Sequence, residues 1–144
     1  MKKGASMDLF TMIYRFNKLY VLRLQEICSA YGVTAVQWLV LHHVYNHEGC
    51  TSIDIVKEWS VEKPTVSSLV RKLNEQGLLQ FTSGQDKRQK NLSLTDEGKT
   101  LCEKITKQVI ELQLFVADPL SEDKVKEWME ELKILEERMK QYER

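Results

Sequence analysis

The chain has 144 residues, and its 21 basic and 21 acidic side chains leave no formal net charge. A chain of this length can bury roughly 70% of its unfolded surface without disulfide bonds. Its three cysteines, at unpatterned spacing, argue against the disulfide framework of a secreted domain and for a reducing cytoplasm. We therefore expect one compact cytoplasmic domain with helical extensions, without a signal peptide or a membrane span.

The beginning of the chain predicts two helices. Residues 8–31 carry apolar side chains every three or four positions, and further apolar residues widen this stripe enough to predict burial from two sides. Gly32 can end this helix because glycine accepts the left-handed conformation. Thr34 and Gln37 match a capping box, which predicts a second helix running to about Asn46.

Two more helices are predicted after a short connection. Thr51 or Ser52 can cap a third helix. The fourth helix follows after only a few residues, with Pro64 near its start, where a missing N–H costs no hydrogen bond. Gly77 ends this fourth helix.

A hairpin and two long helices complete the predicted elements. Residues 79–82 and 91–94 each alternate apolar with polar side chains, so they predict two strands joined by a polar, exposed tip. Thr95 can cap a fifth helix and Ser121 a sixth, whose apolar residues recur close to a heptad spacing.

This order predicts a mainly α-helical chain with a small β-hairpin wing, that is, a winged helix-turn-helix. We expect one domain over 1–144, with a DNA-binding region at 34–98 and a helical dimerisation region formed by 8–31 and 99–142. The terminal helices are too long to serve only the central module, so their apolar stripes need partners. A two-fold dimer would supply them and would present two recognition helices to successive major grooves.

The fourth predicted helix has one apolar face and one polar face. Apolar residues at positions i, i+3, i+4 and i+7 should face the core, namely Val66, Leu69, Val70 and Leu73. The other faces then carry short hydroxyl side chains near the helix start and Arg71 one turn later. Such hydroxyls can reach base edges or phosphates, and arginine can bind guanine or a phosphate with two hydrogen bonds. The alternative is an ordinary solvated helix face.

The hairpin tip is rich in cations. Residues 60–94 hold six basic and three acidic side chains, a local net charge of +3. Lys87, Arg88 and Lys90 fall within four positions, and such a tip suits a narrow minor groove with its enhanced negative potential. Asp86 could pair with Arg88 and fix its direction. A solvated charged turn is the alternative.

Three segments in order resemble the MarR family of bacterial transcription regulators over nearly the whole chain. They are Gln37-Trp38-Leu39-Val40-Leu41, then Thr65 to Leu73 closed by Gly77-Leu78, then Asp86-Lys87-Arg88 followed by Leu94-Thr95 and Gly98. The resemblance implies a triangular homodimer, pseudopalindromic operators and usually repression. It also implies release from DNA when a small phenolic or similar effector binds.

The resemblance implies roles for particular residues. It identifies Asp86 and Arg88 as the wing pair and Arg71, with its serine neighbours, as groove-reading. The chain departs from the family pattern at Glu62-Lys63-Pro64, where small or hydroxyl residues are commoner before the recognition helix. The predicted DNA-contacting residues are Ser52, Lys63, Pro64, Thr65, Ser67, Ser68, Arg71, Lys72, Asp86, Lys87, Arg88 and Lys90.

Two weaker patterns point to sensing chemistry. His43 and His47 are four residues apart and could ligate zinc, but no carboxylate or cysteine follows at a helpful spacing, so we predict no metal site. Cys28, Cys50 and Cys102 lack an evident cationic setting, and we expect small buried hydrophobic side chains rather than redox sensors. A metal- or redox-sensing repressor remains an alternative.

We predict a sequence-specific DNA-binding regulator and no enzyme. The chain has no glycine-rich phosphate loop or nucleophile elbow, and its three histidines lie within six residues. Expected partners are operator DNA, a second copy of the chain and a small-molecule effector, with no cofactor. The rival hypothesis is a winged-helix protein-interaction module that does not bind DNA.

Overall fold

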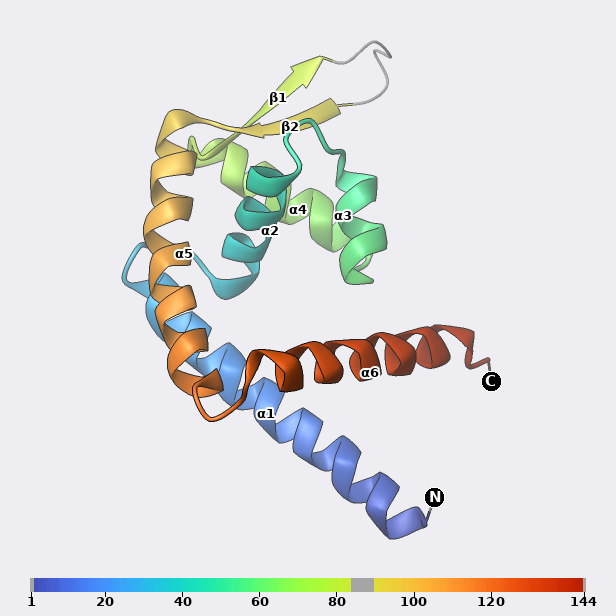
Figure 1. Ribbon diagram of the computed structural model, residues 1–144. Helices are drawn as coiled ribbons and strands as arrows, with labels where there is room; N and C mark the ends of the chain where they lie inside the picture. The colour runs from blue at the N-terminus through green and yellow to red at the C-terminus, as the bar shows by residue number, and fades with distance from the viewer. Residues whose placement is uncertain (1, 84–89, 144) are drawn as a thin grey trace. The chain divides into compact units, whose positions relative to one another are not determined.

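The computed structural model describes residues 2–83 and 90–143 (Figure 1). The chain divides into two compact units, Met1–Val109 and Ile110–Arg144. The helices of the described residues are α1 (Lys3–Ser29), α2 (Ala35–Asn46), α3 (Ser52–Trp59), α4 (Lys63–Glu75), α5 (Asp96–Ala117) and α6 (Glu122–Gln141). The strands are β1 (Leu79–Ser83) and β2 (Lys90–Leu94), which confirms the predicted class of a mainly helical chain with one hairpin.

Local hydrogen bonds start α2 and α3 where the sequence predicts. The Gln37 N–H donates to Thr34 Oγ1 at 3.1 Å, and the Thr34 N–H donates back to Gln37 Oε1 at 2.9 Å. Thr51 forms the same reciprocal pair with Asp54, at 3.3 and 2.8 Å. Thr51 is therefore the cap of α3, and Ser52 is the first residue of the helix.

Glycine ends α4 by the predicted mechanism. Gly77 has φ +74°, and its N–H donates to the Asn74 carbonyl while the Leu78 N–H donates to the Leu73 carbonyl, both at 3.0 Å. This is the Schellman pattern, which satisfies carbonyls that the helix leaves free. The chain then turns directly into β1.

The hairpin is one residue longer at its outer end than predicted. β1 and β2 are antiparallel, and Ser83 pairs with Lys90. Lys90 is therefore the first residue of β2 and does not belong to the tip. The strand β2 also bonds on its other side, because the Gly49 N–H donates to the Leu92 carbonyl and the Leu92 N–H to the Cys50 carbonyl, both at 2.8 Å.

Four residues join the end of α4 to the start of α5, and we call them the α4–α5 junction: Gly77, Leu78, Thr95 and Gly98. The Thr95 hydroxyl donates to the Gly77 carbonyl at 2.6 Å and accepts the Gly98 N–H at 3.0 Å, which caps α5 as predicted. The Thr95 N–H donates to the Leu78 carbonyl at 3.2 Å. A Cβ at residue 98 would lie 1.9 Å from that carbonyl oxygen, so only glycine fits.

The core of the first unit lies between α2, α4, the hairpin and the beginning of α5. Leu41, Leu73, Leu92 and Ile105 are fully buried there. Polar side chains at the rim add links between α2 and α5. Trp38 Nε1 donates to Thr106 Oγ1 at 3.1 Å, and the Tyr45 hydroxyl donates to Glu103 at 2.9 Å.

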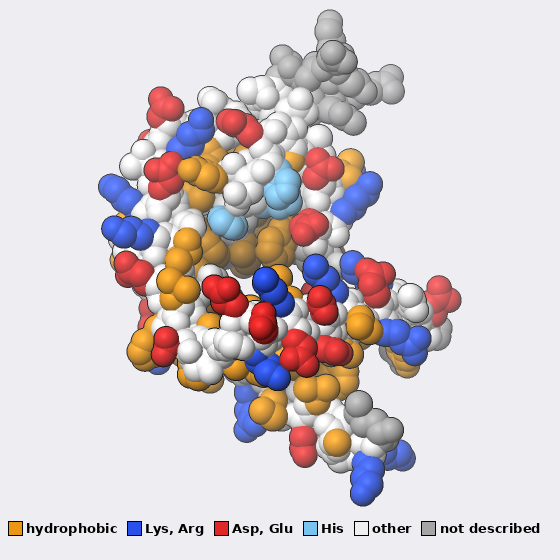
Figure 2. Space-filling model, in the orientation of Figure 1, with side chains coloured by type: hydrophobic (Ala, Val, Ile, Leu, Met, Phe, Trp, Pro, Cys, Tyr) orange, Lys and Arg blue, Asp and Glu red, His pale blue; other side chains and the backbone are white. Residues whose placement is uncertain are grey.

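The helix α1 begins earlier than predicted and is buried only near its end. Within the chain only Leu24 and Cys28 of this helix are buried, so the predicted burial from two sides does not occur in a single copy. Its first part instead exposes large apolar side chains, some of them visible in orange in Figure 2. They are Met7, Leu9, Phe10, Met12, Ile13, Tyr14, Phe16, Leu19, Val21 and Leu22.

The second unit contains the end of α5 and all of α6. Its last helix starts as predicted, because Ser121 accepts the Lys124 N–H at 3.1 Å. No residue of α6 is buried. Exposed apolar residues of this unit are Ile110, Leu114, Phe115, Val116, Trp128, Met129, Leu132, Ile134, Leu135, Met139 and Tyr142. Among the described helices, none is both long and apolar enough to cross a membrane.

The α4–α5 junction predicts a strong penalty for one added methyl group. Gly98→Ala should lower the free energy of unfolding by roughly 3 kcal/mol, because the new Cβ collides with backbone that cannot rotate away. Gly4→Ala is the matched control, since a Cβ there meets nothing within 4 Å and alanine favours the helix. Chemical denaturation checks both, and equal unfolding midpoints for Gly98→Ala and the unaltered protein would contradict the account.

Candidate nucleic-acid interface

The helices α3 and α4 contact one another and are joined by only three residues, 60–62 (Figure 1). Ser60 ends α3 in the left-handed conformation, with φ +51° and ψ 39°. This tight turn sets α4 across α3 in the manner of a helix-turn-helix. One side of α4 is held in the core, and the other is left to the solvent.

The buried side of α4 is the one that the spacing predicts. Val66, Val70 and Leu73 are buried, while Leu69 is half-buried at the edge of the core. Each of these contacts fixes the rotation of the helix about its own axis. The polar residues between them must therefore point away from the core.

The predicted contact residues of α4 lie on that outward side. Thr65, Ser67, Arg71 and Lys72 are exposed, and Ser68 is half-buried. Lys63 and Pro64 are exposed in the first turn of the helix, and Ser52 is half-buried at the start of α3. The structure thus leaves short hydroxyls and three cations on the exposed surface of α4.

The start of α4 differs from that of its neighbours. Glu62 occupies the N-cap position, but its side chain makes no capping hydrogen bond. The departure from the family pattern at this entry therefore has a structural consequence, because hydroxyl side chains cap α2, α3 and α6. Pro64 has no N–H, and the Thr65 N–H already donates to the Glu62 carbonyl at 3.1 Å. Among the first three residues of α4, only the Lys63 N–H is therefore left to an acceptor outside the helix.

The predicted wing contacts divide into two groups. Asp86, Lys87 and Arg88 lie outside the described residues. Lys90 is exposed at the start of β2, and its Nζ lies 5.1 Å from the centroid of the Phe81 ring. The sequence analysis did not predict this contact between Lys90 and Phe81, although Lys90 lies two residues before Leu92 and therefore on the same face of the strand.

The charge of this surface is positive among the described residues as well. Residues 60–83 and 90–94 hold four basic side chains and two acidic ones, a net charge of +2. The basic residues are Lys63, Arg71, Lys72 and Lys90. None of the four forms an ion pair with another described residue. An excess of exposed cations favours an anionic partner such as a phosphate backbone.

The three histidines take part in two stacked ring pairs, one of them with Trp38 of α2. His43 stacks on His47 with ring centroids 4.5 Å apart, and His42 stacks on Trp38 at 5.2 Å; Figure 2 shows histidine side chains gathered on one face. Burial and then the neighbouring His47 lower the pKa of His42 and of His43 below 6.5. No group of three or more metal-ligating side chains occurs among the described residues.

The cysteines are buried and free. Burial raises the pKa of Cys28 to about 11, and it also raises the pKa values of Cys50 and Cys102. Reactive thiols need the thiolate form, which these environments disfavour. The three side chains thus occupy settings that suit packing better than redox sensing.

Comparison with known proteins follows the same outline. The sequence model of the MarR family matches residues 31–89, the segment from the end of α1 to the hairpin. An uncharacterized HTH-type transcriptional regulator of Staphylococcus aureus strain Mu50 is 30% identical over 125 residues, covering 85% of this chain and 86% of that protein. The chain belongs to the MarR family.

Solved structures of MarR-family proteins share its fold. Staphylococcus aureus MarR in complex with salicylate and kanamycin matches with a TM-score of 0.83 and 28% identity, covering 97% of this chain and 96% of that one. The S. aureus MepR–DNA complex matches with a TM-score of 0.79 and 27% identity, covering 91% and 94% of the two chains.

The histidine environments of this MarR-family protein predict a stability that depends on pH. Burial disfavours the protonated forms of His42 and His43 in the folded chain, so their pKa values lie below the 6.5 of the unfolded chain. Lowering the pH from about 7.5 to 5.5 should therefore reduce the free energy of unfolding, because the unfolded state takes up more protons. Replacing His43→Gln should flatten this dependence. Denaturant titrations at several pH values measure it, and an unchanged slope in the variant would contradict the assignment.

Proposed function

We propose that the protein is a transcription repressor that binds a pseudopalindromic operator as a homodimer. The observation that supports this most directly is the surface of α4. Its apolar side is buried in the core, its hydroxyl and cationic side chains are exposed, and it contacts β1 of the hairpin whose other strand carries Lys90. Hydroxyls and arginine on an exposed helix suit direct contact with base edges in a major groove.

The exposed apolar side chains support the dimer. They gather on the first part of α1 and on the helices of the second unit, while the helix-turn-helix module has its own buried core. Soluble proteins rarely leave large apolar patches without a partner. A second copy of the chain, packed through 8–31 and 99–142, would cover these faces around the two modules at 34–98.

A homodimer would set the distance between the two α4 helices. Two copies of α4 held about 34–36 Å apart can enter successive major grooves on one side of a duplex. A small molecule that favours a dimer with another spacing would weaken contact at both half-sites together. The S. aureus MarR relative holds salicylate and kanamycin, which supports a small-molecule effector here. We place the protein in the cytoplasm and infer a binding role rather than a catalytic one.

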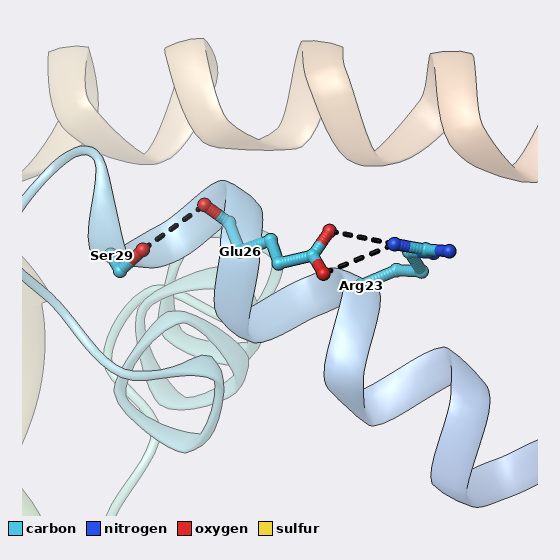
Figure 3. A network of polar contacts seen from close by, with 3 residues as sticks. All are labelled: Arg23, Glu26 and Ser29. Carbon is cyan, nitrogen blue, oxygen red and sulfur yellow. Dashed lines mark hydrogen bonds and ion pairs between the residues drawn. The ribbon is translucent and has the colours of Figure 1, made fainter.

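Arg71 should contribute more to binding than an arginine that already has a partner. Figure 3 shows Arg23 paired with Glu26 on α1. Arg23 Nη1 lies 3.0 Å from Glu26 Oε2, whereas Arg71 has no ion-pair partner among the described residues. Arg71→Ala should weaken duplex binding by about 1–3 kcal/mol, and the matched control Arg23→Ala should leave it nearly unchanged. Fluorescence anisotropy at fixed salt measures both. Equal affinities for Arg71→Ala and the unaltered protein would refute the assigned role.

Selection of bound duplexes from a random pool tests the proposed function as a whole. The enriched sequences should contain an inverted repeat whose half-sites are centred about 10 base pairs, or a multiple of one helical turn, apart. Affinity for these duplexes should fall steeply as salt rises, because phosphate contacts release counterions. Enrichment of no sequence, together with no duplex binding at low salt, would instead favour a protein-interaction module.

A further inference from the structure

One face of the hairpin is buried in the core at its inner end and extends past the core toward its outer end. Directly paired residues of antiparallel strands share a face, so Leu79 and Leu94, Phe81 and Leu92, and Ser83 and Lys90 form three successive rows on one side. The first row is buried on both strands. In the second row Leu92 is fully buried, whereas Phe81 is 38% exposed.

Phe81 therefore lies where this face of the hairpin passes from the buried core to the solvent. The third row places Lys90 diagonally across from Phe81, with its ammonium nitrogen 5.1 Å from the centroid of the ring. This distance lies within the range of a cation–π interaction. The lysine stem can lie along the apolar ring while the charge stays in water.

Contact with the ring restricts a flexible side chain. A free lysine on a strand end samples many rotamers, and binding a phosphate would require it to lose that freedom. A lysine already held over an aromatic ring loses less on binding. The hairpin that carries Lys90 also adjoins the proposed DNA-binding helices, because β2 contacts α3 and the end of α4 leads into β1.

We propose that Phe81 is a positioning residue that holds the Lys90 ammonium ready to bind a backbone phosphate at the outer end of the described strands. This inference rests on the proposed DNA-binding function. Phe81 itself makes no contact with DNA in this scheme and acts through Lys90. The competing explanation is purely structural, namely that the lysine stem only shields the exposed part of the ring.

A double-mutant cycle on duplex binding separates the two explanations. The variants are Phe81→Leu, which keeps an apolar side chain but removes the ring, Lys90→Met, which keeps the stem but removes the charge, and the double variant. Phe81→Tyr is the conservative variant that retains a ring. Lys3→Met, exposed at the start of α1 and outside the regions assigned to DNA binding and dimerisation, is the control for loss of a lysine charge. Thermal unfolding of each variant confirms that it is folded.

The proposal predicts a specific pattern of affinities. Phe81→Leu should weaken binding by about 2- to 5-fold, Phe81→Tyr should bind like the unaltered protein, and Phe81→Leu should have no further effect once Lys90 is Met. Lys90→Met should also lower the slope of log affinity against log salt by about one phosphate contact, whereas Lys3→Met should not. Equal effects of Phe81→Leu with and without Lys90 would overturn the proposal and leave the proposed function intact.

A second measurement examines the pair in the absence of DNA. Ring currents from Phe81 should shift the NMR signals of the Lys90 ε-methylene group upfield, and this shift should vanish in Phe81→Leu but remain in Phe81→Tyr. A Lys90 signal at its random-coil position in the unaltered protein would overturn the proposal. If the unaltered protein binds no duplex at any salt concentration, both the proposed function and this inference fail.

Discussion

The orientation of α4 depends on a small set of backbone contacts at the α4–α5 junction. One hydroxyl, that of Thr95, bonds both to the carbonyl that ends α4 and to the N–H group of Gly98 in α5. The Leu78 carbonyl occupies the space that any other side chain at residue 98 would need. The proposed recognition helix and the base of the hairpin are therefore fixed to α5. A change in the direction of α5 would move α4 with it.

This connection gives the proposed regulation a physical route. The first part of α1, the end of α5 and α6 expose most of the large apolar side chains, which a second copy of the chain would cover in the proposed dimer. A rearrangement of the proposed dimer contacts would pass along α5 to the α4–α5 junction and change the spacing of the two α4 helices. Packed helices transmit such shifts as discrete changes between arrangements, rather than as gradual bending.

Local chemistry made much of this structure predictable from the sequence. The caps at Thr34, Thr95 and Ser121 and the turn at Gly77 depend on residues within four positions, and the structure confirms them. Contacts between distant segments were not predictable in the same way. The contact between the Phe81 ring and Lys90 depends on the exact strand register, and the polar residues between the strands do not determine that register. The sequence also could not show that the apolar stripe of α1 is mostly uncovered in one chain, because periodicity does not identify the partner that buries a face.

The composition of the protein–duplex complex tests the central claim most directly, namely that two rigidly held α4 helices act together on one operator. Sedimentation equilibrium of the protein with a duplex enriched from the random pool gives the mass of the complex. The account predicts two chains on each duplex at every ratio of protein to DNA, with no stable species that contains a single chain. A complex of one chain with one duplex as the main species would contradict it.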